Sequence, residues 1–346
     1  MTTVPQAQPL RNSELGRFSR DITRFNVRPL WERTQSMKPG SPALPTLWRY
    51  ADLRPELMRA AELITTHEAE RRVLMLENPG LPGSTYITNS LYCGLQIILP
   101  GEVAPAHRHS SNALRFIIEG EGAYTTVEGE RVAMHAGDFV LTPGWSWHDH
   151  GHVGQGPVIW LDALDNPFTQ FFGAIFRENY PEDKHPVTHP DGDAAARFGA
   201  ALLPVDYRPD RLASPLLVYP YARTREALER LARSAPHPVH GFKLRYANPA
   251  TGGYPFPTIA VFMQLLPRGF SGKPYRCTDG TVFNVVEGTG TVAIDGETFA
   301  FAPHDVFVVP PWCTYALEAA GDCVLFSYSD RAAQEALGFW REETRA

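Results

Sequence analysis

Two stretches of the chain decide the fold: GEVAPAHRHSSNALRFIIEGEG, residues 101–122, and GDFVLTPGWSWH, residues 137–148. Both contain short apolar segments separated by Gly, Pro and Asn, which is the pattern of consecutive short β-strands. The same pattern extends from residue 84 to about residue 164. A succession of short strands of this kind predicts a β-barrel or a β-sandwich.

The composition is that of a globular protein. Of the 346 residues, 43% are hydrophobic and 20% are charged, which leaves ample material for a core. The 31 Pro and 28 Gly favour many turns over long helices. A formal charge of −6 argues against a nucleic-acid partner. Because the sequence has no apolar run of membrane-spanning length and no signal-type N-terminus, we expect a cytoplasmic protein without a membrane partner.

A second strand-rich block, from about residue 246, repeats the first. Residues 119–122 (EGEG) fall on residues 287–290 (EGTG), and Trp145 falls on Trp312. Two copies of one β unit are therefore predicted. The alignment assigns the following partners to three histidines of the first copy: His107, His109 and His148 fall on Tyr275, Cys277 and Tyr315. Chemistry is expected in the first copy alone, and no second metal site is expected.

The histidines of the first copy form a candidate metal site. His107 and His109 are two residues apart, so on a strand both side chains leave the same face. An adjacent strand of a small barrel could bring His148 to them, and His150 should point into the same interior. Imidazole suits Zn, Cu, Fe and Ni, so the ligands alone do not name the metal. The alternatives are a surface histidine pair for H-x-H and a rim position for His150.

The two stretches resemble the two cupin motifs, G-x5-H-x-H followed by E and G, and G-x5-P-x-G-x2-H. The whole chain resembles the bicupin ring-cleaving dioxygenases of the gentisate 1,2-dioxygenase group. Two departures from the general cupin pattern are visible: the usual glutamate ligand would fall near Ala113 or Leu114, and Trp145 stands at the glycine of the second motif. The first departure leaves a site of three histidines, which is what the gentisate group has.

The resemblance implies a mainly β bicupin fold of two double-stranded β-helix (jelly-roll) barrels, with a helical N-terminal prelude and linker helices. Val73–Leu76 is expected as a strand after the prelude, and Thr65 with Glu68 as a capping box. The expected division of the chain is a helical N-terminal segment (1–83), a first cupin barrel with the metal site (84–165), a linker with helices (166–245), a second, degenerate barrel (246–330) and a C-terminal helix (331–346).

The resemblance also implies a function. The group uses one Fe(II) per chain and O2 to cleave gentisate (2,5-dihydroxybenzoate) to maleylpyruvate in aromatic catabolism, commonly as a homotetramer. Three neutral imidazoles leave Fe(II) its full charge, which suits a dianionic chelating hydroxybenzoate. Salicylate, a substituted salicylate or 1-hydroxy-2-naphthoate are alternative substrates. Two other classes stay open: a non-catalytic, ligand-binding cupin, and a cupin isomerase that uses Zn or Mn without O2.

Several polar side chains are candidates for the substrate. Arg115 is a charged residue in an apolar strand and needs a partner, either an aromatic carboxylate or an internal ion pair. Asp162, also in an apolar strand, could orient His150 and raise its basicity. By resemblance, five residues hold substrate or oxygen: Arg71, Gln96 and Arg115 as substrate-binding residues, and His150 and Asp162 as catalytic residues.

Overall fold

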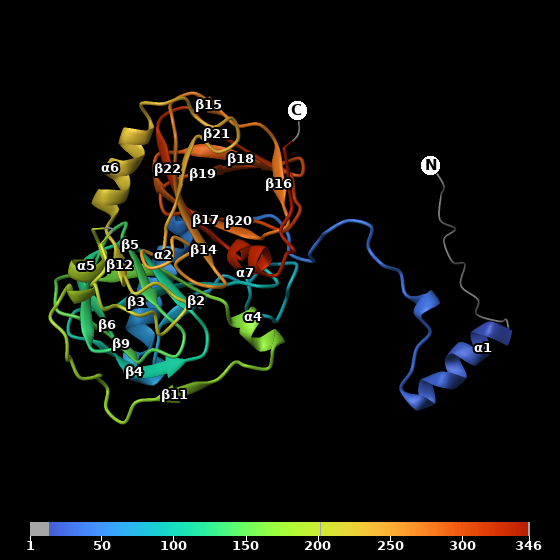
Figure 1. Cartoon of the computed structure of the whole chain (residues 1–346), viewed down its shortest axis with the longest axis horizontal. Coiled ribbons are helices and arrows are strands. Elements are labelled where there is room, and N and C mark those ends of the chain that lie inside the picture. Colours follow the sequence, from blue (N-terminus) through green and yellow to red (C-terminus); the bar gives the residue numbers. More distant parts are fainter. Residues whose placement is uncertain (1–13, 201, 345–346) are drawn as a thin grey trace. The chain divides into compact units, whose positions relative to one another are not determined.

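The computed structural model describes residues 14–200 and 202–344. The chain divides into two compact units, Met1–Pro39 and Gly40–Ala346. The described part of the first unit contains one helix and two short 3-10 turns: α1 (Glu14–Asp21), η1 (Ile22–Phe25) and η2 (Leu30–Glu32). The second unit contains all of the strands and the remaining helices (Figure 1). Within the described residues, no helix has the length and apolar character needed to cross a membrane.

The first barrel is built from two antiparallel sheets. In order across the sheet, the first contains β12 (Val218–Tyr219), β8 (Phe139–Thr142), β5 (Ala113–Glu119), β10 (Val158–Leu164), β3 (Tyr92–Ile98) and β2 (Val73–Met75). The second contains β11 (Arg177–Asn179), β4 (Val103–His109), β9 (His148–His152), β6 (Glu121–Val127) and β7 (Glu130–His135). Closing strands into a barrel leaves few unpaired edges.

The second barrel repeats this arrangement. Its first sheet contains β1 (Thr46–Trp48), β20 (Val306–Val309), β17 (Thr281–Glu287), β22 (Cys323–Ser329), β14 (Ala260–Leu266) and β13 (Phe242–Arg245). Its second contains β19 (Glu297–Phe301), β18 (Gly290–Ile294), β21 (Tyr315–Ala319), β16 (Tyr275–Cys277) and β23 (Glu342–Thr344), with β15 (Phe270–Ser271) paired to β21. The predicted mainly β fold of two related barrels is confirmed.

Segments outside the two repeats complete both barrels. The predicted strand at residues 73–76 is β2, which pairs with β3 of the first barrel. The prelude also supplies β1, which was not predicted and pairs with β20 of the second barrel. The predicted capping box of Thr65 and Glu68 is present at the start of α3. The helices of this unit are α2 (Tyr50–Leu63), α3 (Thr66–Ala69), α4 (Asn166–Phe171), α5 (Asp193–Phe198), α6 (Tyr221–Leu231) and α7 (Arg331–Ala336).

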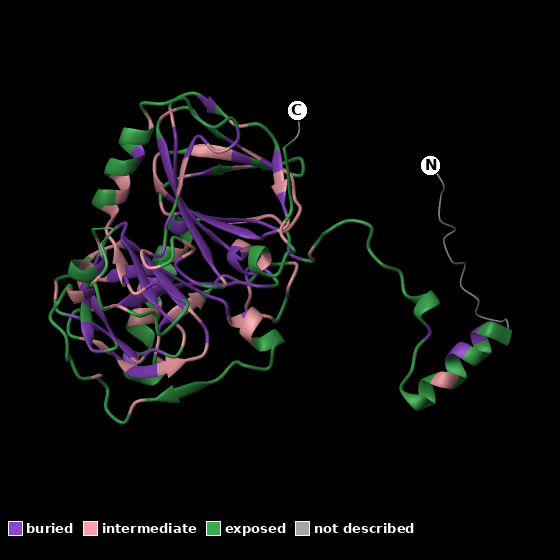
Figure 2. Cartoon of the chain, viewed as in Figure 1, coloured by how far each residue is buried: buried purple, intermediate pink, exposed green. Residues whose placement is uncertain are grey.

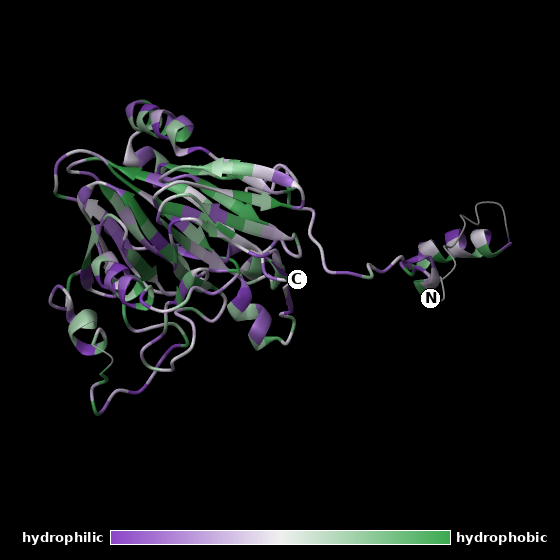
Figure 3. Cartoon of the chain, turned by 90° about the horizontal axis from the view of Figure 1, so that it is seen from above, coloured by the Kyte–Doolittle hydropathy of each residue, from purple (hydrophilic) through white to green (hydrophobic). Residues whose placement is uncertain are grey.

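The first sheets of the two barrels pack against each other and form the main hydrophobic core. Side chains of β5 and β8 meet side chains of β22, and the rings of Phe116 and Phe326 stack with their centroids 4.1 Å apart. Buried residues gather on the strands of both barrels (Figure 2), and the same strands carry most of the hydrophobic residues (Figure 3). The apolar layer between the barrels is thus distinct from the interior of each barrel, where further buried apolar residues form smaller clusters.

We expect the substitution Phe326→Ala to lower the free energy of unfolding by about 3–5 kcal/mol, because it removes a fully buried ring from between the barrels. Chemical denaturation followed by tryptophan fluorescence measures this change. Phe339, which is 64% exposed, is the matched control, and Phe339→Ala should change the free energy by less than about 0.5 kcal/mol. Equal effects of the two substitutions would contradict the proposed role of the interbarrel layer.

Candidate active site

The three predicted histidines lie together inside the first barrel. Strands β4 and β9 pair so that His107 stands directly opposite His148, and His109 leaves the same face of β4 as His107. One ring nitrogen from each of the three residues lies within 4.8 Å of the others. The ring centroids of His107 and His148 are 4.3 Å apart. This cluster, called the histidine triad below, could hold one metal ion.

The hydrogen bonds of the triad leave the same nitrogen free on each ring. In every case Nδ1 faces a backbone carbonyl two residues away: Pro105 for His107 at 3.3 Å, Ser111 for His109 at 2.8 Å and Ser146 for His148 at 2.9 Å. An Nδ1–H that donates to a carbonyl leaves Nε2 with a lone pair, which is the form that binds a metal. Nε2 of His148 is buried without a hydrogen-bond partner. The donor set therefore fits a divalent transition metal.

Burial keeps the triad neutral. It lowers the pKa of His107 to about 2 and that of His109 to about 4, and it lowers the pKa of His148 well below its ordinary value. Positive neighbours, Arg71 for His107 and Arg115 for His109, act in the same direction. Neutral imidazole is the metal-binding form, so the site needs no deprotonation at physiological pH.

Trp145 ties the two ligand-bearing strands together. Its backbone N–H donates to the carbonyl of His109 at 2.7 Å, just before the chain enters β9. The backbone of Trp145 has a φ of 66°, a left-handed conformation that residues other than glycine rarely adopt. The guanidinium of Arg108 lies 4.2 Å from the centroid of the Trp145 ring. These contacts explain how tryptophan is accommodated at the position of the motif glycine.

Arg115 and Asp162 form a buried ion pair across neighbouring strands. They are directly opposite each other on β5 and β10, and Nε of Arg115 is 3.7 Å from Oδ1 of Asp162. The internal ion pair, one of the two alternatives for Arg115, is thus present. Both of these atoms nevertheless lack a hydrogen bond. Nη1 of Arg115 donates to Oγ1 of Thr142, a fully buried hydroxyl on β8. The pair retains hydrogen-bonding capacity for a ligand.

The expected contact between Asp162 and His150 is absent. Neither ring nitrogen of His150 has a hydrogen-bond partner, although the side chain is fully buried. The reason is strand register: Asp162 faces Arg115, whereas His150 comes from the opposite sheet and packs beside Trp160 with ring centroids 5.5 Å apart. The hypothesis that Asp162 orients His150 is therefore corrected to one in which Asp162 positions Arg115.

Arg71 reaches the triad from the segment before β2. Its Nη2 donates to the carbonyl of Pro105 at 3.0 Å and lies 2.5 Å from Nδ1 of His107. The two contacts of His107 Nδ1 require different protonation states. Arg71 can donate only to an Nδ1 without a proton, whereas the carbonyl of Pro105 can accept only from an Nδ1 that carries one. In the Nδ1–H form, which would leave Nε2 for a metal, Arg71 keeps its bond to Pro105. Burial lowers the pKa of Arg71 to about 9, and the charge of Arg115 adds to this shift.

Gln96 is a further polar residue beside Asp162. It stands opposite Trp160 on the pair β3 and β10, so it shares a face with Asp162, two residues further along β10. Its Oε1 is buried without a partner. All eight predicted site residues thus belong to the first barrel or line it. Thr142 and Trp160 were not predicted to be part of the site. The sequence did contain a signal for each: Thr142 lies inside the second histidine motif, and Trp160 is two residues from Asp162, so the two side chains share a face of the strand.

The chain is similar to proteins of known activity. The cupin domain profile matches residues 94–164. The gentisate 1,2 dioxygenase 1 of Aquipseudomonas alcaligenes is 50% identical over 97% of this chain and 98% of its own. The 5-aminosalicylate 1,2-dioxygenase of a Comamonas species is 34% identical over 96% of this chain and 91% of its own. A variant of the salicylate 1,2-dioxygenase of Pseudoaminobacter salicylatoxidans, solved in complex with gentisate, superposes with a TM-score of 0.93 at 35% identity, covering 99% of both chains.

We expect His148→Ala to abolish metal binding, because it removes the ligand that joins the two strands of the site. Metal bound after anaerobic loading with Fe(II) and desalting, measured by inductively coupled plasma mass spectrometry, should be one equivalent per chain in the wild type and none in the variant. His135→Ala is the control, since this side chain is 59% exposed and should leave the metal content unchanged. Two equivalents per wild-type chain would contradict a single site.

Proposed function

The chain belongs to the gentisate 1,2-dioxygenase family of bicupin ring-cleaving dioxygenases, and we propose that it cleaves gentisate with O2 to maleylpyruvate, using one Fe(II) held by the histidine triad. The ring opens between the carbon that carries the carboxylate and the carbon that carries the adjacent hydroxyl. Both atoms of O2 enter the product, so no external reductant is needed.

The observation that carries this proposal is an excess of buried positive charge beside the triad. Arg115 is a buried cation and Arg71 is a half-buried one, and the charge of Asp162 acts on both. The three imidazoles are neutral and add no negative charge to balance a divalent metal. A buried excess of cations is costly without a counter-ion. A hydroxybenzoate bound through its carboxylate and its deprotonated hydroxyl would supply the missing negative charge.

The triad fits iron by its chemistry. Imidazole nitrogen is a suitable ligand for non-haem Fe(II), and three protein ligands leave positions for a bidentate substrate and for O2. When bound, the iron supplies the redox chemistry that allows O2 to react with the aromatic ring. Ala113 and Leu114 are buried apolar residues, so neither replaces the glutamate of other cupins.

The residues of the chain then bind and orient the substrate. We assign the carboxylate to Arg115, whose Nε has no hydrogen-bond partner, with Arg71 as a second cation. Asp162 and Thr142 hold the guanidinium of Arg115 from two neighbouring strands. His150 is neutral because burial lowers its pKa, so its two unpartnered nitrogens offer one donor and one acceptor to the ring hydroxyl groups. The fully buried Trp160 beside it limits the access of water.

The relatives are named for hydroxybenzoates that differ in the substituent at the 5-position of the ring, so the identity of this substituent in the substrate is the open question. Gentisate carries a hydroxyl there, 5-aminosalicylate carries an amino group and salicylate carries hydrogen. Gentisate is favoured because the relative at 50% identity over nearly the whole chain is a gentisate dioxygenase, whereas the 5-aminosalicylate enzyme is 34% identical. Salicylate, another substituted salicylate and 1-hydroxy-2-naphthoate are the alternative substrates.

We expect Fe(II)-loaded protein to consume one O2 per gentisate and to form one ring-opened product. An oxygen electrode and the absorbance of maleylpyruvate measure the two amounts. On a panel of hydroxybenzoates at equal concentration, kcat/KM should be highest for gentisate. A higher kcat/KM for salicylate or 5-aminosalicylate would overturn the substrate assignment, and no oxygen uptake with any of them would favour a ligand-binding cupin or a non-oxidative isomerase.

We expect Asp162→Asn to lower kcat/KM for gentisate by about 10- to 100-fold at unchanged iron content, because Arg115 loses the carboxylate that positions it. Steady-state kinetics and metal analysis of the same preparations provide the test. Asp210→Asn is the control, since Asp210 is 74% exposed and should keep wild-type kinetics. Turnover of Asp162→Asn within a few-fold of the wild type would contradict the positioning role.

A further inference from the structure

The second barrel has lost the histidine triad but retains polar side chains in its interior. Lys243 on β13 stands directly opposite Gln264 on β14, and Ser327 on β22 stands opposite Phe262, the residue two positions from Gln264. The direct partner of Gln264 on β22 is Leu325, so Ser327 lies diagonal to Gln264 on the same face of the sheet. These three side chains on neighbouring strands are called the polar row below. The ammonium of Lys243 lies 4.6 Å from the ring centroid of Phe262 and 5.9 Å from that of Phe283, which places it over the aromatic interior of this barrel.

The polar row lacks hydrogen-bond partners. Both amide atoms of Gln264 and the hydroxyl of Ser327 are buried without a partner, and each of these residues is 0% exposed. Among the described residues, no carboxylate lies within 4 Å of the Lys243 ammonium. Buried polar groups in folded proteins are nearly always paired, because an unpaired group has lost its bonds to water. The amide of Gln264 and the hydroxyl of Ser327 are therefore free to hydrogen-bond a small ligand.

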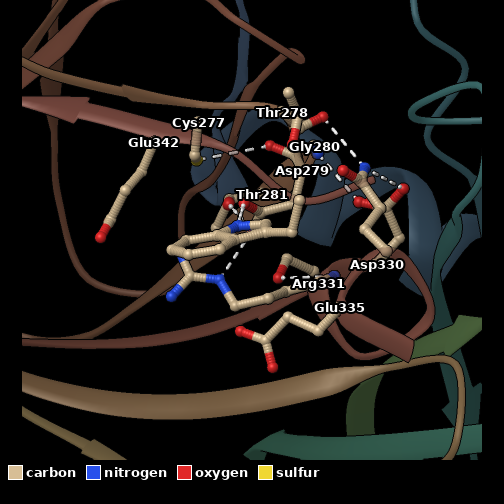
Figure 4. A network of polar contacts seen from close by, with 12 residues as sticks. Cys277, Thr278, Asp279, Gly280, Thr281, Asp330, Arg331, Glu335 and Glu342 are labelled. Atoms are coloured by element: carbon tan, nitrogen blue, oxygen red, sulfur yellow. Dashed lines mark hydrogen bonds and ion pairs between the residues drawn. The ribbon is translucent and has the colours of Figure 1, made fainter. Parts of the chain in front are cut away.

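The acidic residues nearby are already engaged. Asp279 pairs with Arg331 at 3.5 Å and accepts from the indole Nε1 of Trp340 at 2.7 Å, in the network of Figure 4. Asp330 accepts from the backbone N–H of Gly280 and from the side chain of Gln334, each at 3.0 Å. Lys243 is therefore a cation without a counter-ion. Burial lowers its pKa to about 8, and the charge of Arg331 acts in the same direction.

Gln264 and Ser327 occupy the positions that correspond to Gln96 and Asp162 in the first barrel. Gln264 matches Gln96, since each faces the edge strand of its sheet, β13 or β2. Ser327 stands opposite Phe283 on β22 and β17, as Asp162 stands opposite Arg115 on β10 and β5. The second barrel has thus exchanged the Arg115 and Asp162 pair for neutral residues, and its cation comes from Lys243 on the edge strand.

We propose that the interior of the second barrel binds one small monovalent anion, of the size of a halide or formate, through the Lys243 ammonium, the Gln264 amide group and the Ser327 hydroxyl. All three can donate a hydrogen bond, as an anion requires. Lys243 retains partial exposure, whereas Gln264 and Ser327 are covered, so the anion would enter from the Lys243 side. This site is independent of the metal and of the proposed reaction in the first barrel.

Crystals of the full chain soaked in sodium bromide test the site directly. We expect an anomalous peak in contact with Nζ of Lys243 in the wild type and its loss in Lys243→Met. Lys273→Met is the matched control, because it removes the charge of an exposed lysine and should keep the peak. Bromide beside Arg71 or Arg115 would belong to the first barrel and should persist in both variants. No peak at Lys243, or a peak that survives Lys243→Met, would overturn the proposal.

Thermal unfolding in formate or bromide tests the same site in solution. At fixed ionic strength, set with methanesulfonate, the midpoint of the wild type should rise with formate or bromide concentration more than that of Lys243→Met. Gln264→Leu serves as a second variant and should also lose part of the rise. Equal dependence in all three proteins would contradict the site. Oxygen uptake with gentisate should be unchanged in Lys243→Met, so failure of this proposal and failure of the dioxygenase proposal give different results.

Discussion

The register between β4 and β9 is the constraint on which the candidate active site depends. It places His107 opposite His148, and the bond from the Trp145 N–H to the His109 carbonyl holds the loop that leads into β9. A shift of one residue would turn the His148 side chain out of the barrel, because side chains alternate along a strand. The site therefore rests on the backbone pairing of these two strands.

The second copy shows that this frame does not need the histidines. Tyr275 stands opposite Tyr315 as His107 stands opposite His148. Trp312 has a φ of 67°, and its N–H donates to the Cys277 carbonyl at 2.7 Å, which repeats the Trp145 contact. The unusual backbone at the two tryptophans thus belongs to the fold, and the imidazoles belong to the chemistry of the first copy.

The sequence was sufficient to predict the parts of the structure that depend on local spacing. The H-x-H pair, the matching turns and the Trp145 and Trp312 positions are repeated along the chain, so the duplication and the histidine triad could be inferred from them. The partner of Asp162 could not, because it depends on which residue of β5 faces β10, and the expected contact with His150 was wrong. The pairing of β1 with the distant β20 was missed for the same reason.

In each barrel two cations lie close to one carboxylate, but the residues differ. In the first, Arg71 and Arg115 share Asp162, and the imbalance lies beside a site for a metal and an anionic substrate. In the second, Arg331 forms an ion pair with Asp279, and Lys243, which stands opposite Gln264, has no ion pair. Random loss of a catalytic site would be expected to fill the interior with apolar side chains, since these need no partners. Apolar side chains do fill most of the second barrel, and the half-buried Lys243 and the unpaired amide of Gln264 are the exceptions that support the proposed anion site.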